Sequence, residues 1–273
     1  CEYCKGFCKT SVKVAFFGWL FAAQKSGFSG FRLSPALPVA SNRQRLCRPY
    51  NPCHICKFLG EKMKFVSTRN SKNSADFEKA VLDCLPSDGG LYVPEITADL
   101  RRWILYADSN TSFANIAGTL TSACINDEFS PIICETIASK AFTFTPEVKK
   151  LDERFYSLKL YNTPTGSHKD FGISFLVNCI ETIHALNGGF STFLDATVGE
   201  LGASLAQFLR GKKHVKAVLV YPKGRVRGLE EGDFVWNGGN ILPVEVDGTE
   251  ADCHKIVREI FDDRQLVEKF HLT

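Results

Sequence analysis

The feature that most constrains the fold is a rhythm of strand, loop and helix that repeats after about residue 150. Strand-like apolar stretches and amphipathic helical stretches follow one another, separated by Gly, Pro, Asn and Asp. The predicted strands are 155–161, 192–196, 215–221 and 241–246, and the predicted helices are 169–186, 201–210 and 250–262. Such alternation predicts an α/β fold, in which helices flank a parallel sheet.

The pattern before residue 150 differs and predicts a small N-terminal α+β domain over 63–150, ahead of the α/β domain over 151–273. Short strands are predicted at 63–68 and 91–93, and helices at 75–85, 111–124 and 129–142. The sequence Asn-Thr-Ser at 110–112 offers N-cap side chains for the second of these helices. Isolated cysteines on apolar helix faces predict buried free thiols in a cytoplasmic protein: Cys84, Cys124, Cys134, Cys179 and Cys253.

Composition changes at Met63, the only methionine of the chain. Residues 1–62 hold ten Lys and Arg against two Glu, a net charge of +8, and six of the eleven cysteines, whereas the remainder has a net charge of −5. We expect Met63 to be the native start, with 1–62 as a basic extension that is non-native or disordered.

Three functional interpretations fit parts of residues 1–62. The pairs Cys1/Cys4 and Cys53/Cys56 resemble zinc knuckles, but 48 residues between the pairs argue against one site. The apolar run 14–23 resembles a targeting segment and is too short to span a membrane. The segment is basic and contains interleaved aromatic residues, as nucleic-acid-binding segments do, but it carries no known nucleic-acid-binding motif. We therefore expect no metal, no nucleic acid and no membrane partner.

Two loops are candidates for chemistry, because each ends a predicted strand and opens a predicted helix, at the sheet edge where ligands bind. The first loop, 161–172, places Lys169 at the start of a helix, where its charge opposes the helix dipole. A lysine amine can form a Schiff base, although a solvated surface lysine would give the same pattern. The second loop, 197–202, is a Gly-x-x-Gly turn whose backbone N–H groups could bind carboxylate or phosphate.

Several motifs in order resemble the threonine synthase family. They are Met63-Lys-Phe-Val-Ser-Thr-Arg-Asn, Ser87-Asp-Gly-Gly-Leu-Tyr-Val-Pro, Pro164-Thr-Gly-Ser-His-Lys-Asp-Phe-Gly, Thr197-Val-Gly-Glu-Leu-Gly, Tyr221-Pro-Lys-Gly and Gly238-Gly-Asn-Ile. The third is similar to the family's motif around the lysine that holds pyridoxal phosphate, and the fourth to its substrate loop. The resemblance covers 63–273 and none of 1–62.

The resemblance implies a partial fold-type II enzyme that uses pyridoxal 5'-phosphate to convert O-phospho-L-homoserine and water to L-threonine and phosphate, a carbon–oxygen lyase reaction. By position, Lys169 holds the cofactor through a Schiff base and moves protons at the substrate Cα and Cβ. Substrate-binding residues carried over in the same way are Thr197, Gly199, Glu200, Gly202, Ser87 and Asp88. An amino acid is then the expected small-molecule partner.

The sequence also departs from the family. Val198, Glu200 and Leu201 stand where the substrate loop has serine, aspartate and threonine, and His168 precedes the lysine in place of phenylalanine. The family's glycine-rich phosphate loop has no counterpart before Thr273, so the resemblance implies a truncated chain with uncovered apolar strand edges such as 215–221. Alternatives are an inactive fragment or interaction protein that retains half of the fold, and a relative acting on another phosphorylated or hydroxylated amino acid.

Overall fold

A three-stranded parallel sheet forms the C-terminal part of the computed structural model, which describes residues 63–101, 107–108, 110–125, 127–224 and 239–273. Its order is β6 (Ser191–Ala196), β7 (Val215–Pro222) and β8 (Ile241–Val246). β7 pairs with β6 on one side and with β8 on the other. The parallel sheet was predicted correctly, but the expectation that β7 has an uncovered edge was wrong, because it is the central strand.

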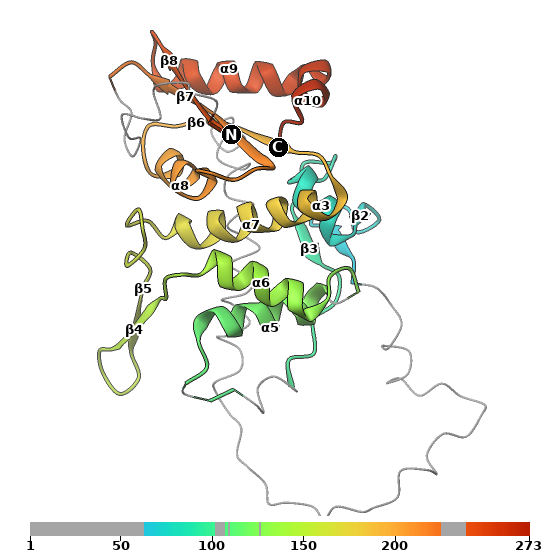
Figure 1. Cartoon of the computed structure of the whole chain (residues 1–273), viewed down its shortest axis with the longest axis vertical. Helices are drawn as coiled ribbons and strands as arrows, with labels where there is room; N and C mark the ends of the chain where they lie inside the picture. Colours follow the sequence, from blue (N-terminus) through green and yellow to red (C-terminus); the bar gives the residue numbers. More distant parts are fainter. Residues whose placement is uncertain (1–62, 102–106, 109, 126, 225–238) are drawn as a thin grey trace, which may run out of the picture.

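Helices cover both faces of this sheet (Figure 1). On one face lie α8 (Glu200–Leu209) and α7 (Lys169–Asn187), and on the other lies α9 (Glu250–Asp262), followed by α10 (Arg264–Phe270). A buried cluster, here called the sheet core, fills the space between α7, α8 and the strands. It contains Ile173, Val177, Ile180, Phe193, Leu205, Ala206, Leu209, Val215, Ala217, Leu219 and Ile241. Apolar side chains on both faces of β7 explain its apolar sequence after the exposed Lys216.

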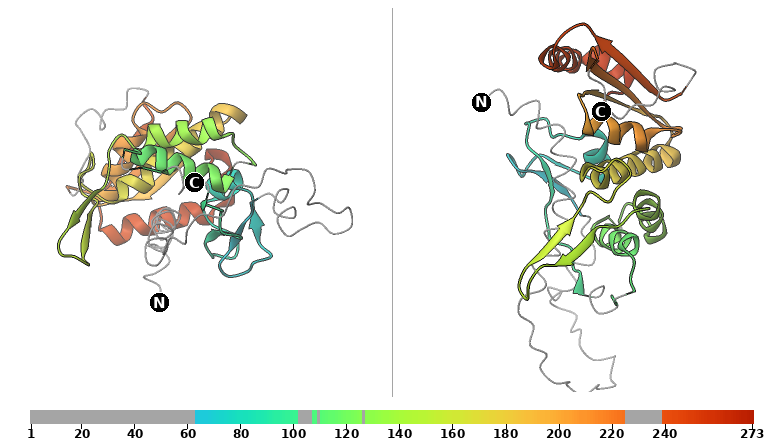
Figure 2. Two further views of the ribbon diagram at one scale, coloured as in Figure 1. Left: turned by 90° about the horizontal axis from the view of Figure 1, so that it is seen from below. Right: turned by 90° about the vertical axis from the view of Figure 1, so that its left-hand side faces the viewer.

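The N-terminal part combines a small antiparallel sheet and a short helix beside α7 with two helices, α6 (Pro131–Ala141) and α5 (Phe113–Ile125), that stack beyond α7 (Figure 2). The sheet order is β2 (Ser74–Ala75), β1 (Phe65–Ser67) and β3 (Tyr92–Pro94), and the short helix is α3 (Phe77–Asp83). The Asn115 N–H donates to the Ser112 hydroxyl at 3.2 Å, which confirms an N-cap residue before α5. A second buried cluster, the helical core, joins these elements to α7.

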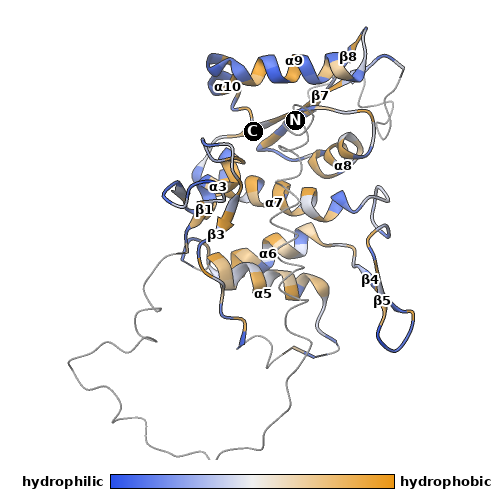
Figure 3. Cartoon of the chain, turned by 180° about the vertical axis from the view of Figure 1, so that it is seen from behind, coloured by the Kyte–Doolittle hydropathy of each residue, from blue (hydrophilic) through white to orange (hydrophobic). Residues whose placement is uncertain are grey.

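α7 is therefore shared by two cores. Phe171, Phe175, Cys179 and Ile183 belong to the helical core, whereas Ile173, Val177 and Ile180 belong to the sheet core. Figure 3 shows α5, α6 and α7 as largely hydrophobic helices, whereas the outer helix α9 carries many hydrophilic residues. The boundary predicted at residue 150 stays a prediction, since the helical core includes residues on both sides of it.

A two-stranded hairpin connects α6 to the loop before α7. It consists of β4 (Glu147–Lys150) and β5 (Tyr156–Lys159), which pair antiparallel and project from the body of the molecule (Figure 1). Val148, Phe155 and Tyr156 are exposed on it. β5 was predicted from its alternation, whereas β4 was not, because its side chains are all exposed and leave no apolar pattern.

Smaller predictions need correction at α3. This helix begins at Phe77, because Asp76 caps it and Ala75 belongs to β2. Cys84 lies just beyond the helix, with a φ of 60°, and is partly exposed, so it is not a buried thiol on a helix face. The other four cysteines of the described part are buried and free, as predicted. Residues 1–62 lie outside the described residues. Among the described residues, no helix is both long and apolar enough to cross a membrane.

Candidate active site

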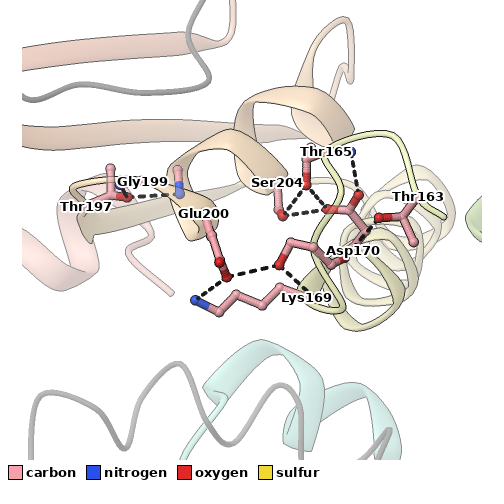
Figure 4. Close-up of polar contacts among 10 residues, drawn as sticks. Thr163, Thr165, Lys169, Asp170, Thr197, Gly199, Glu200 and Ser204 are labelled. Carbon is pink, nitrogen blue, oxygen red and sulfur yellow. Dashed lines mark hydrogen bonds and ion pairs between the residues drawn. The ribbon is translucent and has the colours of Figure 1, made fainter. Parts of the chain in front are cut away.

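The two predicted loops lie side by side where α7 and α8 begin (Figure 4). α7 starts at Lys169, directly after the loop that follows β5, and α8 starts at Glu200, after the turn that ends β6. The Ser167 hydroxyl donates to Glu200 Oε2 at 3.2 Å, although these residues are 33 positions apart. Packing of α7 against α8 in the sheet core therefore brings together the lysine and the glycine turn.

Lys169 points its amine toward the start of α8. Its Nζ lies 3.5 Å from Glu200 Oε2, and the two side chains are 34% and 65% exposed (Figure 4). The Lys169 N–H donates to the Ser167 hydroxyl at 3.3 Å, so one serine contacts both members of the ion pair. Glu200 faces the candidate reactive amine in this arrangement, and its predicted role in substrate binding stays a prediction. The amine remains open enough for a ligand to reach it.

The turn from Thr197 to Gly202 is braced from within. The Thr197 hydroxyl accepts the N–H groups of Gly199 at 3.3 Å and Gly202 at 3.0 Å, and the side chain is buried. A Cβ at Gly202 would lie 2.5 Å from Thr197 Cγ2, so only glycine allows this approach. Among the described residues the N–H groups of Glu200 and Leu201 have no acceptor. Open donors at a helix start form a site suited to an anion.

Sequence reasoning missed a buried polar cluster beside Lys169. Asp170 is fully buried, and its carboxylate accepts the Thr165 N–H at 2.8 Å, the Thr165 hydroxyl at 2.6 Å and the Ser204 hydroxyl at 2.5 Å. Two signals were present in the sequence: an acidic residue in the first turn of α7, and a serine one helical turn after Glu200. Neither signal reveals contact between the two helices.

Ser87 and Asp88 lie in the turn between α3 and β3. The Asp88 carboxylate accepts hydrogen bonds from the Ser67 hydroxyl at 2.7 Å and from the Gly90 N–H at 2.9 Å. These bonds lower the pKa of Asp88. Ser87 accepts the side-chain amide of Asn73 at 3.2 Å. Among the described residues no hydrogen bond or ion pair joins Ser87 or Asp88 to Lys169 or to the glycine turn. Their role toward a substrate stays a prediction.

Comparison with known proteins finds similarity to threonine synthases. Residues 64–142 match the family model described as the threonine synthase N terminus. The chain is similar to threonine synthases over part of their length. It is 30% identical to the threonine synthase of Buchnera aphidicola from Schizaphis graminum over 212 residues, which cover 77% of this chain and 49% of the relative. It is 30% identical to the Escherichia coli threonine synthase over 204 residues, 75% of this chain and 47% of that protein.

Solved threonine synthase structures share the fold. The structure of pyridoxal-phosphate-bound threonine synthase from Brucella melitensis matches with a TM-score of 0.67 and 25% identity, over 77% of this chain and 47% of that one. The Escherichia coli threonine synthase structure matches with a TM-score of 0.61 and 30% identity, over 77% and 49%. The chain thus spans about half the length of the threonine synthases it matches.

Proposed function

We propose that this chain carries the lysine side of a pyridoxal-phosphate site in a threonine-synthase-like lyase. The proposed reaction converts O-phospho-L-homoserine and water to L-threonine and phosphate. The relatives named threonine synthase support this class of activity. The five free cysteines of the described residues support a cytoplasmic location, and an amino acid is the proposed partner.

One observation carries the proposal: the Lys169 amine faces the start of α8, beside backbone N–H groups that have no hydrogen-bond acceptor among the described residues. The residues fit the cofactor in two respects. The Lys169 side chain is 34% exposed, which leaves it within reach of an aldehyde, and a Cβ built at Gly199 meets nothing within 4 Å, so space is open at the turn. When bound, pyridoxal phosphate supplies an electron sink for negative charge that develops on the substrate carbons.

The roles of the chain's own residues follow from their positions. Lys169 would hold the cofactor through Nζ and, when released, move a proton at the substrate Cα and Cβ. Glu200 attracts Nζ and accepts the Ser167 hydroxyl, so it orients the amine toward α8. The N–H groups at the start of α8 would bind an acidic group of the substrate, where the helix dipole also favours negative charge.

The decisive experiment is a titration with pyridoxal phosphate, followed by the absorbance of the lysine-bound cofactor. Borohydride trapping and peptide mapping then locate the label. We expect labelling at Lys169 and loss of the band in Lys169→Ala. The matched control is Lys255→Ala, since Lys255 also pairs with a carboxylate, Glu259, at 3.8 Å but lies on α9. An unchanged band in Lys169→Ala would refute the proposal.

A second candidate is favoured by the composition of the turn. Val198 and Leu201 supply no hydroxyl donors, which leaves backbone N–H groups to meet the substrate. A relative that acts on another phosphorylated amino acid would fit this turn equally well. Phosphate release from O-phospho-L-homoserine and from O-phospho-L-serine, measured with cofactor present, separates the two candidates. Release from neither substrate, together with cofactor binding, would favour a non-catalytic protein.

A further inference from the structure

The buried carboxylate of Asp170 is the strongest feature outside the roles assigned so far. It is fully buried, and no ion pair joins it to any of the described residues. Burying a carboxylate is costly unless hydrogen bonds compensate for the lost water. Three bonds do so here, from the Thr165 N–H, the Thr165 hydroxyl and the Ser204 hydroxyl, and the start of α7 adds a favourable dipole.

These bonds cross between three elements. Thr165 lies in the loop before α7, Asp170 in the first turn of α7, and Ser204 in α8, 34 positions from Asp170. Ser204 is fully buried, so water does not compete for its hydroxyl. Capping the start of α7 does not require this bridge, because the Asp170 carboxylate could accept N–H groups of its own helix turn without Ser204. The bridge instead fixes where the loop sits relative to α8.

The geometry of α8 gives this bridge a consequence for Lys169. Glu200 and Ser204 are four residues apart and therefore share one face of the helix. Glu200 contacts Ser167 and Lys169 at the exposed end of this face, while Ser204 contacts Asp170 at its buried end (Figure 4). The loop is thus held to α8 at two points, with Lys169 between them in the chain.

We propose that Asp170 is a positioning residue, which ties the 163–168 loop to α8 through Ser204 and Thr165 and so keeps the Lys169 amine directed at the glycine turn. This inference rests on the proposed function, since it assigns Asp170 a purpose at the same site. Without the tie, the loop and the start of α7 could shift against α8. The amine would then spend less time in the arrangement in which it meets a ligand bound at the turn.

Two substitutions each delete one bond of the tie without altering Asp170 or Lys169. Ser204→Ala deletes the hydroxyl from α8, and Thr165→Val deletes the hydroxyl from the loop while the N–H bond remains. The matched control is Ser174→Ala, because Ser174 is also a fully buried helical serine, but its hydroxyl donates within α7 to the Phe171 carbonyl. Thermal unfolding of all three variants shows whether each is folded.

Two readouts test the inference. The first needs no cofactor: amide hydrogen exchange of peptides covering 163–169. Loss of one charge-assisted bond corresponds to about tenfold faster exchange in Ser204→Ala and Thr165→Val, with no change in Ser174→Ala. The second is the rate of borohydride-trapped labelling at Lys169 by pyridoxal phosphate, which we expect to fall by about tenfold in the same two variants. If the substitutions only destabilised the fold, they would lower the unfolding temperature without a specific decrease in the labelling rate at Lys169.

The outcomes separate the inference from the proposed function. Equal exchange and equal labelling in Ser204→Ala, Thr165→Val and Ser174→Ala would overturn the positioning role. If the unsubstituted chain takes no label at Lys169, the proposed function fails. The tie is then judged by exchange alone: faster exchange of 163–169 in both variants supports it, and unchanged exchange overturns it.

Discussion

The two faces of α7 lie in cores of different character. On the helical-core side, Phe113, Phe142 and Phe144 surround Phe171, with ring centroids 4.9 to 6.4 Å apart. On the sheet-core side, α7 meets mainly aliphatic side chains from parallel strands and α8. The difference teaches that α7 is fixed from both sides by independent packing. The body of α7 is therefore held by both cores, whereas its first residue, Lys169, is placed by the contacts of the first turn with α8.

The largest expected effect comes from truncating one isoleucine of α7 in each of the two cores. Ile180 belongs to the sheet core and Ile183 to the helical core, and both are buried. Each change to Ala is expected to lower the free energy of unfolding by about 2–5 kcal/mol, because it removes buried methyl groups and leaves a cavity. Urea unfolding followed by circular dichroism measures this loss.

The control for this pair is Ile132→Ala, because Ile132 is 75% exposed on α6. It is expected to change the free energy of unfolding by less than about 0.5 kcal/mol. If either core variant behaves like this control, that face of α7 is not packed as described. Two separate unfolding transitions would show that the cores do not unfold together.

The starts of α3 and α9 receive capping bonds from very different distances along the chain. In the N-terminal part, both carboxylate oxygens of Glu128 accept N–H groups of α3, from Phe77 at 2.7 Å and Glu78 at 3.0 Å. In the C-terminal part, α9 is capped locally by a reciprocal pair, Thr249 and Asp252. The first cap spans about 50 positions of the chain and the second only three.

Glu128→Ala tests the long-range cap. It leaves two N–H groups at the start of α3 without their acceptor, so we expect a loss of about 1–3 kcal/mol in the free energy of unfolding. Thr249→Ala, which removes the local cap of α9, is expected to cost about 1 kcal/mol. Chemical denaturation ranks the two. A smaller loss for Glu128→Ala than for Thr249→Ala would contradict the view that the N-terminal part depends more on tertiary contacts.

The smallest effect is a pH dependence at the local cap. The Thr249 N–H and hydroxyl bind the Asp252 carboxylate and lower its pKa from the usual value of 3.8. Asp252 therefore stabilises the fold above about pH 4, and this contribution is lost as the pH falls through the lowered pKa. The difference in stability between the unsubstituted chain and Asp252→Asn should shrink between pH 6 and strongly acid pH. A difference independent of pH would contradict this assignment.

Sequence patterns predicted the elements that have strong periodicity or strong end signals. The helix predicted at 250–262 is found as α9 over the same residues, and the strand predicted at 241–246 is β8. The elements that were missed, β2, β4 and α10, are short or largely exposed, so no apolar pattern marks them. The start of α3 was misplaced because its cap depends on Asp76 and on Glu128 from across the chain.

By itself, the sequence determined that a parallel sheet is flanked by helices, that Lys169 begins one helix, and that a glycine turn begins another. These features follow from local periodicity and backbone chemistry, which act over a few residues. Only the tertiary structure decided that Glu200 faces Lys169 and that Ser204 reaches Asp170. Both contacts depend on how α7 packs against α8, and that packing is set by apolar side chains from the whole sheet core.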